Sequence, residues 1–241
     1  MTVGLVIVSH SEKIAEGVVE LAGQMAADVA ISPAGGTDDG RIGTSFDKVT
    51  AALSTAESGD GVVVLCDLGS AVLTAETALD FLEEEARDRV EIVDAPLVEG
   101  AVAAAVAAAS GAGRSDVAAA ARTANSMAGE PDRADATSDA TAGETGDVAA
   151  SSPDAEAPYE RSVVLVNRDG LHARPAAEFV KLASRYDTPV TVNGKDAKSL
   201  LAIMGLGLTA GATVRLSTPQ RAGAEAVDAL AALVESGFGE T

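Results

Sequence analysis

An acidic segment over residues 130–157 divides this chain of 241 residues into two parts. It consists of Ala, Asp, Glu, Ser, Thr, Gly and Pro, with one arginine and a single valine as its only large aliphatic residue. Such a segment cannot bury enough apolar surface to offset its chain entropy, so we expect a disordered linker. The sequence therefore predicts a domain over residues 1–129, a linker over 130–157 and a second domain over 158–241.

Charge is distributed unevenly over these three parts. The first domain has a net charge of −13, the linker −7 and the second domain 0, which together give −20 for the chain. A nucleic-acid-binding protein needs a basic face toward the phosphates, so we expect no nucleic-acid partner. In the neutral second domain, four basic residues are expected to gather around His172: Arg168, Arg174, Lys181 and Arg185.

Residue types that bind metals or cross membranes are scarce in this chain. It has one cysteine, Cys66, and two histidines, so we expect neither an intrachain disulfide nor a zinc site. No run of about 18 apolar residues occurs, and no basic region precedes the apolar run at the N-terminus. We therefore expect a cytoplasmic protein without a metal, a cofactor or a membrane partner.

The first domain alternates between predicted strands and predicted helices. Residues 3–9 and 61–70 contain continuous apolar runs bounded by turn-forming residues, which are typical of strands buried on both faces. Helical spacing follows the first run, through Ile14, Val18, Leu21 and Met25. This alternation predicts an α/β fold with a doubly wound, mainly parallel sheet.

The second domain has another pattern. Strands are predicted over residues 160–167 and 212–219, with a third strand over 188–197 that ends in an Asn-Gly turn. Helices are predicted over residues 173–186, 199–208 and 222–236. About 80 residues with this content suggest a small α+β open-faced sandwich.

Both histidines lie where a predicted strand gives way to a helix. His10 follows the first strand, and His172 lies in "RDGLHARPAA". A helix N-terminus exposes unpaired N–H groups and attracts anions. A neutral imidazole placed there can attack phosphorus, with Arg174 holding the phosphoryl oxygens and Pro175 in the first turn. The alternative for His172 is a capping or core-edge histidine beside a solvated arginine.

The segment "CDLGSA" adds polar groups at the same edge of the first sheet. Asp67 can accept a hydrogen bond from one nitrogen of His10 and leave the other nitrogen nucleophilic. Gly69, Ser70 and Ala71 then offer backbone N–H groups, and Ser70 a hydroxyl, to a phosphoryl group. A helix cap is the alternative role of Asp67.

Two segments of the second domain resemble HPr, the histidine-containing phosphocarrier of the phosphoenolpyruvate:sugar phosphotransferase system. They are "NRDGLHARPAAEFVKLAS" and "KSLLAIMGLGLTAGATVRL", and the resemblance extends over residues 159–241. It implies that His172 carries a phosphoryl group and that Arg174 assists it, although Ala173 replaces the Ser or Thr of many HPr proteins. Ser199 is an expected helix N-cap, and it corresponds to a serine that a regulatory kinase phosphorylates in some HPr proteins.

Three segments of the first domain resemble the DhaM family, the phosphotransferase subunits of PTS-dependent dihydroxyacetone kinases. They are "GLVIVSHSEKIAEGV", "GGTDDGRIGTS" and "CDLGSAVLTAE". The resemblance covers about residues 1–127 and implies a mannose-type enzyme IIA fold that forms a homodimer. It also implies that His10 carries a phosphoryl group and that Asp67 orients it.

Together the two resemblances imply a relay of phosphoryl groups. Enzyme I, charged by phosphoenolpyruvate, phosphorylates His172, which passes the group to His10. His10 then phosphorylates ADP bound to the subunit DhaL, which serves the dihydroxyacetone-binding subunit DhaK. Because the chain stops at Thr241, enzyme I is expected to be a separate protein.

Two other functions remain open on the sequence alone. One is a mannose-type enzyme IIA–HPr fusion that serves a membrane sugar transporter. The other is a regulatory binding module that is controlled by its phosphorylation state.

Overall fold

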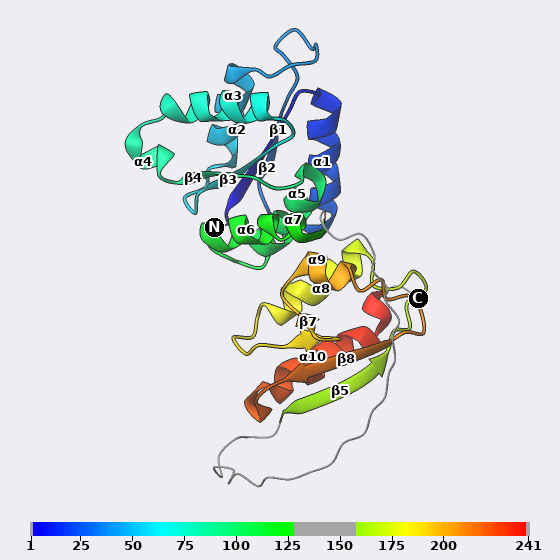
Figure 1. The fold of residues 1–241 in the computed structure, drawn as a ribbon. Helices are drawn as coiled ribbons and strands as arrows, with labels where there is room; N and C mark the ends of the chain where they lie inside the picture. The colour runs from blue at the N-terminus through cyan, green and yellow to red at the C-terminus, as the bar shows by residue number, and fades with distance from the viewer. Residues whose placement is uncertain (1, 128–157, 240–241) are drawn as a thin grey trace, which may run out of the picture.

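A computed structural model describes residues 2–127 and 158–239, which form two sheet-based units (Figure 1). The first unit contains residues 2–127, and the second contains residues 158–239. The linker expected over residues 130–157 lies outside the described residues.

The first unit is built on a parallel sheet with the strand order β2-β1-β3-β4. The strands are β1 (Gly4–Ser9), β2 (Ile31–Gly35), β3 (Val62–Cys66) and β4 (Val90–Val93). Each strand is followed by a helix that crosses back over the sheet, as parallel pairing requires. The expected doubly wound parallel sheet is therefore confirmed.

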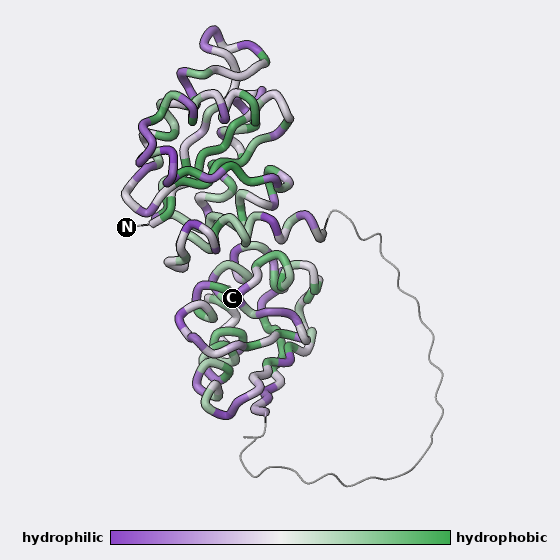
Figure 2. The backbone as a smooth tube through the Cα atoms, turned by 60° about the vertical axis from the view of Figure 1, so that its left-hand side comes forward, coloured by the Kyte–Doolittle hydropathy of each residue, from purple (hydrophilic) through white to green (hydrophobic). Residues whose placement is uncertain are grey.

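Successive residues of β1 point to opposite faces of this sheet, so both faces are apolar. Leu5 and Ile7 face α1 (Glu12–Met25) and α5 (Leu97–Ala109). Val6 and Val8 face α2 (Phe46–Ala56) and α3 (Gly69–Asp80). Figure 2 shows these strands as a hydrophobic centre enclosed by more polar segments.

The buried face of α1 differs from the predicted one. Ile14 and Leu21 are 49% and 44% exposed, whereas Ala15 and Ala22 are fully buried with Val18 and Met25. The prediction was therefore right for Val18 and Met25, whereas the neighbours of Ile14 and Leu21 take the buried positions. Small alanines face inward because α1 lies close to the sheet: a Cβ on Gly35 of β2 would overlap Ala15.

The first unit contains three further helices, and the sequence predicted none of them as a separate element. They are α4 (Glu84–Arg87), α6 (Arg114–Arg122) and α7 (Ala124–Met127). In α6, Val117, Ala118 and Ala121 are buried against the Ala-rich α5. Because alanine dominates both helices, the usual alternation of large apolar and polar residues is too weak there to predict α6.

The second unit has an antiparallel sheet with the strand order β5-β8-β6-β7. Its strands are β5 (Tyr159–Val164), β6 (Thr191–Val192), β7 (Lys195–Asp196) and β8 (Thr213–Thr218). The helices α8 (Ala173–Ala183), α9 (Leu200–Met204) and α10 (Ala224–Glu235) cover one face, with short 3₁₀ turns at Arg221–Gly223 and Gly237–Gly239.

The other face of this sheet is open. Val163 and Leu165 are buried under the helices, whereas Val164 is 52% and Val166 is 59% exposed. The expected α+β open-faced sandwich is therefore confirmed. The strand predicted over residues 188–197 is instead a hairpin, because Asn193 and Gly194 both have positive φ and turn the chain back on itself.

The two units contact each other through α8 and α9 of the second and the helices α1, α5 and α7 of the first (Figure 1). Leu201 is 3% exposed and packs against Ala103 and Ala124. The ammonium group of Lys181 donates to the backbone oxygen of Met25 at the end of α1. Lys181 is therefore directed at the first unit, and the expectation that it joins a basic cluster around His172 is wrong.

Two observations concern membranes and metals. No helix within residues 2–127 and 158–239 is long and apolar enough to cross a membrane. In the same residues, no three His, Cys, Asp or Glu side chains are grouped so that they could hold a metal ion.

Candidate functional site

His10 and Asp67 meet at the carboxyl ends of the two central strands of the first unit. β1 and β3 are adjacent and parallel, with Val8 opposite Cys66, so the residues that follow each strand reach the same edge. This edge is where open α/β sheets place their binding sites. The side chains are partly buried, with 20% of His10 and 16% of Asp67 exposed.

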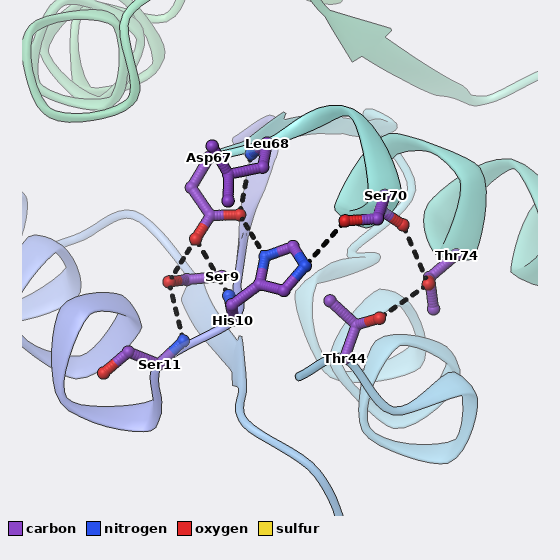
Figure 3. Close-up of polar contacts among 8 residues, drawn as sticks. All are labelled: Ser9, His10, Ser11, Thr44, Asp67, Leu68, Ser70 and Thr74. Carbon is purple, nitrogen blue, oxygen red and sulfur yellow. Dashed lines mark hydrogen bonds and ion pairs between the residues drawn. The ribbon is translucent and has the colours of Figure 1, made fainter. Parts of the chain in front are cut away.

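The carboxylate of Asp67 accepts four hydrogen bonds (Figure 3). Its Oδ1 accepts from Nδ1 of His10 at 2.9 Å and from the Leu68 N–H at 2.8 Å. Its Oδ2 accepts from the His10 N–H at 2.9 Å and from the Ser9 hydroxyl at 2.8 Å. Burial works to raise the pKa of Asp67, but the bonds from His10 and Ser9 outweigh it and hold this pKa below its ordinary value.

These contacts decide which nitrogen of His10 is free to react. An ionised carboxylate only accepts hydrogen bonds, so Nδ1 carries the proton that it shares with Asp67. In the neutral ring, Nε2 then has the lone pair, and it accepts from the Ser70 hydroxyl at 2.7 Å. The structure therefore brings together Asp67, His10 and Ser70, with the lone pair of Nε2 on the side of α3.

The N-terminus of α3 faces this nitrogen and offers some of the expected N–H groups. The amides of Gly69 and Ser70 make no hydrogen bond within the described part of the chain. The amide of Ala71 donates to the backbone oxygen of Leu68 at 2.9 Å, because the first turn of the helix is tight there. Ala71 is therefore not a free donor to a phosphoryl group, and that expectation is corrected.

The loop over residues 36–45 contacts the residues of this site through a backbone amide and a hydroxyl. The Gly43 N–H donates to the backbone oxygen of His10 at 2.9 Å. The hydroxyls of Thr44 and Thr74 are 2.7 Å apart, and Thr74 donates to the backbone oxygen of Ser70 at 3.1 Å (Figure 3). One pair of hydroxyls thus connects the loop to the turn of α3 that holds Ser70.

Cys66 lies directly before Asp67, and its thiol is expected to react slowly. Burial, together with the negative charges of Asp67 and Glu76, raises the pKa of its thiol to about 12. The thiol is therefore protonated at neutral pH and is a poor nucleophile.

His172 is presented at the start of α8 by a tight turn. Gly170 has a φ of +71°, and a Cβ there would approach the backbone oxygen of Leu208 to 2.3 Å, so only glycine fits. The buried Asn167 side chain donates to the backbone oxygen of Gly170, and the Leu171 N–H donates to Leu208 O at 2.8 Å. Hydrogen bonds from Asn167 and to Leu208 therefore fix the backbone of Gly170 and Leu171 directly before His172.

The groups around His172 are accessible from outside. His172 is the N-cap residue of α8 and its side chain is exposed, while Pro175 is buried in the first turn. Arg174 is 70% exposed, and its Nε is 3.8 Å from the nearest oxygen of Glu178, too far for a hydrogen bond. The guanidinium group of Arg174, two residues after His172 in the chain, thus forms an exposed i,i+4 ion pair with Glu178. Ser199 caps α9, since its hydroxyl accepts from the Ala202 N–H.

Comparison with known proteins agrees with this division into two units. The family model of the PTS system fructose IIA component matches residues 4–131, and that of the PTS HPr component phosphorylation site matches residues 159–236. A phosphoryl donor subunit DhaM of the PEP-dependent dihydroxyacetone kinase 2 of Listeria innocua is 46% identical over 105 residues, which are 43% of this chain and 84% of that protein. This chain belongs to the DhaM family. The DhaM subunit of Escherichia coli is 39% identical over 251 residues, or 99% of this chain, and this chain spans 51% of its length.

Other relatives match one unit only. The phosphocarrier protein HPr of Vibrio cholerae is 44% identical over 81 residues, which are 32% of this chain and 95% of that protein. A solved structure of HPr from Thermoanaerobacter tengcongensis is 42% identical and covers 34% of this chain and 98% of that chain, with a TM-score of 0.32. A solved protein of unknown function is 37% identical and covers 52% of this chain and 96% of that chain, with a TM-score of 0.48.

Proposed function

We propose that this DhaM chain is a two-histidine phosphocarrier that receives a phosphoryl group on His172 and passes it to His10. The observation that carries this proposal is the Asp67–His10–Ser70 arrangement, in which Nδ1 is bonded to a carboxylate and Nε2 faces a hydroxyl. Such an arrangement supports attack on phosphorus by a neutral imidazole. The match of residues 159–236 to the HPr phosphorylation site supports the same role for His172.

The transfer step balances without any further reactant. The Nε2 lone pair of His10 attacks the phosphorus atom on His172, and the P–N bond to His172 breaks as the new one forms. The electron pair returns to the ring of His172, while the Nδ1 proton of His10 stays on its bond to Asp67. The amides of Gly69 and Ser70 and the positive end of α3 then face the transferred oxygens, and Arg174 spreads their charge on the donor side.

The direction of the relay follows from the proteins that the chain resembles. Curated relatives are phosphoryl donor subunits of PEP-dependent dihydroxyacetone kinases, which supports enzyme I and phosphoenolpyruvate as the source of the phosphoryl group. We propose ADP bound to DhaL as the acceptor, with DhaK holding dihydroxyacetone. A homodimer through the first unit stays a prediction, which sedimentation at several protein concentrations can test.

Counting phosphoryl groups by intact mass tests the two carriers. The chain is incubated with enzyme I and phosphoenolpyruvate, alone and as His10→Ala and His172→Ala. We expect two acid-labile groups on the unchanged chain, one on His10→Ala and none on His172→Ala. Phosphorylation of His172→Ala by enzyme I would overturn the order of the relay.

A second measurement identifies the acceptor. The charged chain is mixed either with DhaL, ADP, DhaK and dihydroxyacetone or with the IIB protein of a mannose-type transporter. We expect loss of the phosphoryl group and formation of dihydroxyacetone phosphate only in the first mixture. Transfer to the IIB protein alone would support a sugar transporter instead, and no transfer in either mixture would support a regulatory module.

A further inference from the structure

Ser9 is a buried polar residue at the end of β1, in direct contact with the proposed site. It is fully buried, and it is the one polar side chain in a strand that is otherwise apolar. Its hydroxyl donates to Oδ2 of Asp67 at 2.8 Å and accepts from the Ser11 N–H at 3.1 Å (Figure 3). A buried hydroxyl of this kind is costly to place in a core unless its hydrogen bonds are made.

The two contacts of Ser9 fix the direction of its hydroxyl proton. The Ser11 N–H can only donate, so it occupies a lone pair of the hydroxyl oxygen. The carboxylate of Asp67 can only accept, so the proton of Ser9 points to Oδ2. Oδ2 also accepts from the His10 N–H, so it accepts two hydrogen bonds. This leaves Oδ1 turned toward Nδ1 of His10.

We propose that Ser9 is a positioning residue for phosphoryl transfer, which holds the carboxylate of Asp67 in the orientation that keeps the proton of His10 on Nδ1. Its effect on the reacting Nε2 atom is indirect and passes through Asp67. The expectation that loss of Ser9 slows transfer rests on the proposed function. Its effect on the carboxylate of Asp67 and the tautomer of His10 can be measured in the unphosphorylated protein without that function.

The alternative is that Ser9 only supports the first turn of α1. Ser11 is the N-cap residue of α1 and makes no side-chain cap, so the bond from its N–H to Ser9 helps to order the start of this helix. Loss of such a cap lowers the stability of the fold without changing the ring of His10. The two roles therefore predict different effects on Asp67.

The ionisable groups near Asp67 are few. The ring of His10 contacts its carboxylate, and Cys66 precedes it in the chain. The Cys66 thiol, whose pKa is about 12, is uncharged at neutral pH, and Glu76 of α3 acts on that thiol. A change in the titration of Asp67 upon loss of the Ser9 hydroxyl therefore reports on this one hydrogen bond and on the state of His10.

Nuclear magnetic resonance of the unphosphorylated full chain tests the proposal. The variants are Ser9→Ala, Ser9→Thr, which keeps the donor, and Ser32→Ala, which removes a similarly buried hydroxyl from β2 that makes none of the bonds to Asp67. The ring nitrogen shifts of His10 give its tautomer, and the carboxyl carbon of Asp67 gives its titration. Single-turnover transfer to His10 is measured on the same proteins.

In Ser9→Ala, we expect Asp67 to titrate about one pH unit higher, since a hydrogen bond to a charged group is worth about that much. We also expect a smaller share of the Nδ1-protonated ring and about tenfold slower transfer. Ser9→Thr should restore all three, and Ser32→Ala should leave them unchanged. An unchanged titration and tautomer in Ser9→Ala would overturn the proposal, even if the variant unfolds more easily. Absence of transfer in the unchanged chain would contradict the phosphocarrier function instead.

Discussion

The hydroxyl oxygen of Ser70 lies 2.7 Å from Nε2 of His10, so the lone pair that we propose as the nucleophile is already hydrogen-bonded in the resting protein. This bond must break as a phosphoryl group arrives. The same hydroxyl can then donate to a phosphoryl oxygen, because Ser70 is the second residue of α3 and lies beside the free amides of the helix N-terminus. The proposed transfer would therefore give Ser70 one hydrogen-bond partner before it and another one after it.

Removal of this hydroxyl is expected to slow transfer. Ser70→Ala loses one donor to the transferring group, and loss of one such donor costs at least about tenfold in rate at a partly exposed site. Single-turnover transfer from the charged second unit to His10 measures the effect. Thr77→Ala is a matched control, since it removes an exposed hydroxyl from the same helix at a distance from His10. An equal effect of both substitutions would contradict the role of Ser70.

Asp67→Asn is expected to have a larger effect on transfer than the loss of Ser70. The amide cannot accept all four hydrogen bonds, and its NH₂ group competes with the proton on Nδ1 of His10. The reacting ring then loses its fixed tautomer, and we expect transfer to slow by about 10²-fold or more. Rates for Asp67→Asn and for Asp28→Asn, an exposed aspartate between α1 and β2, provide the comparison. A rate within threefold of the unchanged chain (roughly 0.6 kcal/mol) would leave Asp67 a structural role only.

Asp67 also predicts how stability depends on pH. Its pKa is lower in the folded chain than in the unfolded chain, where it is about 3.9. The stabilisation is therefore complete above that value and is lost as the pH falls through the folded pKa. Urea unfolding at pH 7 and near pH 3 should show a smaller pH dependence for Asp67→Asn than for the unchanged chain. An identical difference between the two pH values would mean that Asp67 is not stabilised by its contacts.

Cys66 is expected to react slowly with thiol reagents in the folded protein. Its pKa of about 12 leaves almost no thiolate at pH 8, whereas an unfolded cysteine titrates near 8.5. Colour development with a disulfide reagent should be slow in buffer and fast in urea, with Cys66→Ser as the blank. Fast labelling of the native chain would contradict the burial of this thiol.

The sequence predicted the first sheet and the meeting of His10 with Asp67 for one physical reason. Parallel strands buried on both faces are continuous apolar runs, and their carboxyl ends share one edge. With both strands predicted in one parallel sheet, the residues that follow them were expected at the same edge, and the structure shows that β1 and β3 are neighbours there. The choice of Nε2 as the reacting atom required the contact distances.

Other features left no signal in the sequence. Ser9 is one polar residue at the end of an apolar run, where a serine can also simply begin a turn. Two of the four buried positions of α1 are the alanines Ala15 and Ala22, so the prediction took the larger Ile14 and Leu21 beside them instead. Whether the amide of Ala71 is free depends on how tightly the first turn of α3 closes, which composition does not determine.

The position of the second unit gives the last prediction. Lys181 of α8 contacts Met25 at the end of α1, whereas α1 begins two residues after His10. A helix of 14 residues is about 21 Å long, so the second unit rests at the opposite end of α1 from the site. The 36–45 loop, whose Gly43 contacts His10, lies at the top of Figure 1, on the side of the first unit away from the second unit. Transfer within one chain therefore requires the second unit to leave this resting position.

Weakening the contact between the units should therefore speed transfer within a chain. Ala124→Asp places a charge against Leu201 at a position that is 1% exposed, while Ala51→Asp places the same charge on the exposed side of α2. Single-turnover transfer from His172 to His10 is measured over a dilution series for both variants and the unchanged chain. We expect rates that do not depend on protein concentration, with a severalfold higher rate for Ala124→Asp alone. Cleavage at a protease site inserted within residues 130–157 should make the rate proportional to concentration, because the units then meet only by diffusion. A rate for the intact chain that already falls with dilution would show instead that His172 of one chain serves His10 of another.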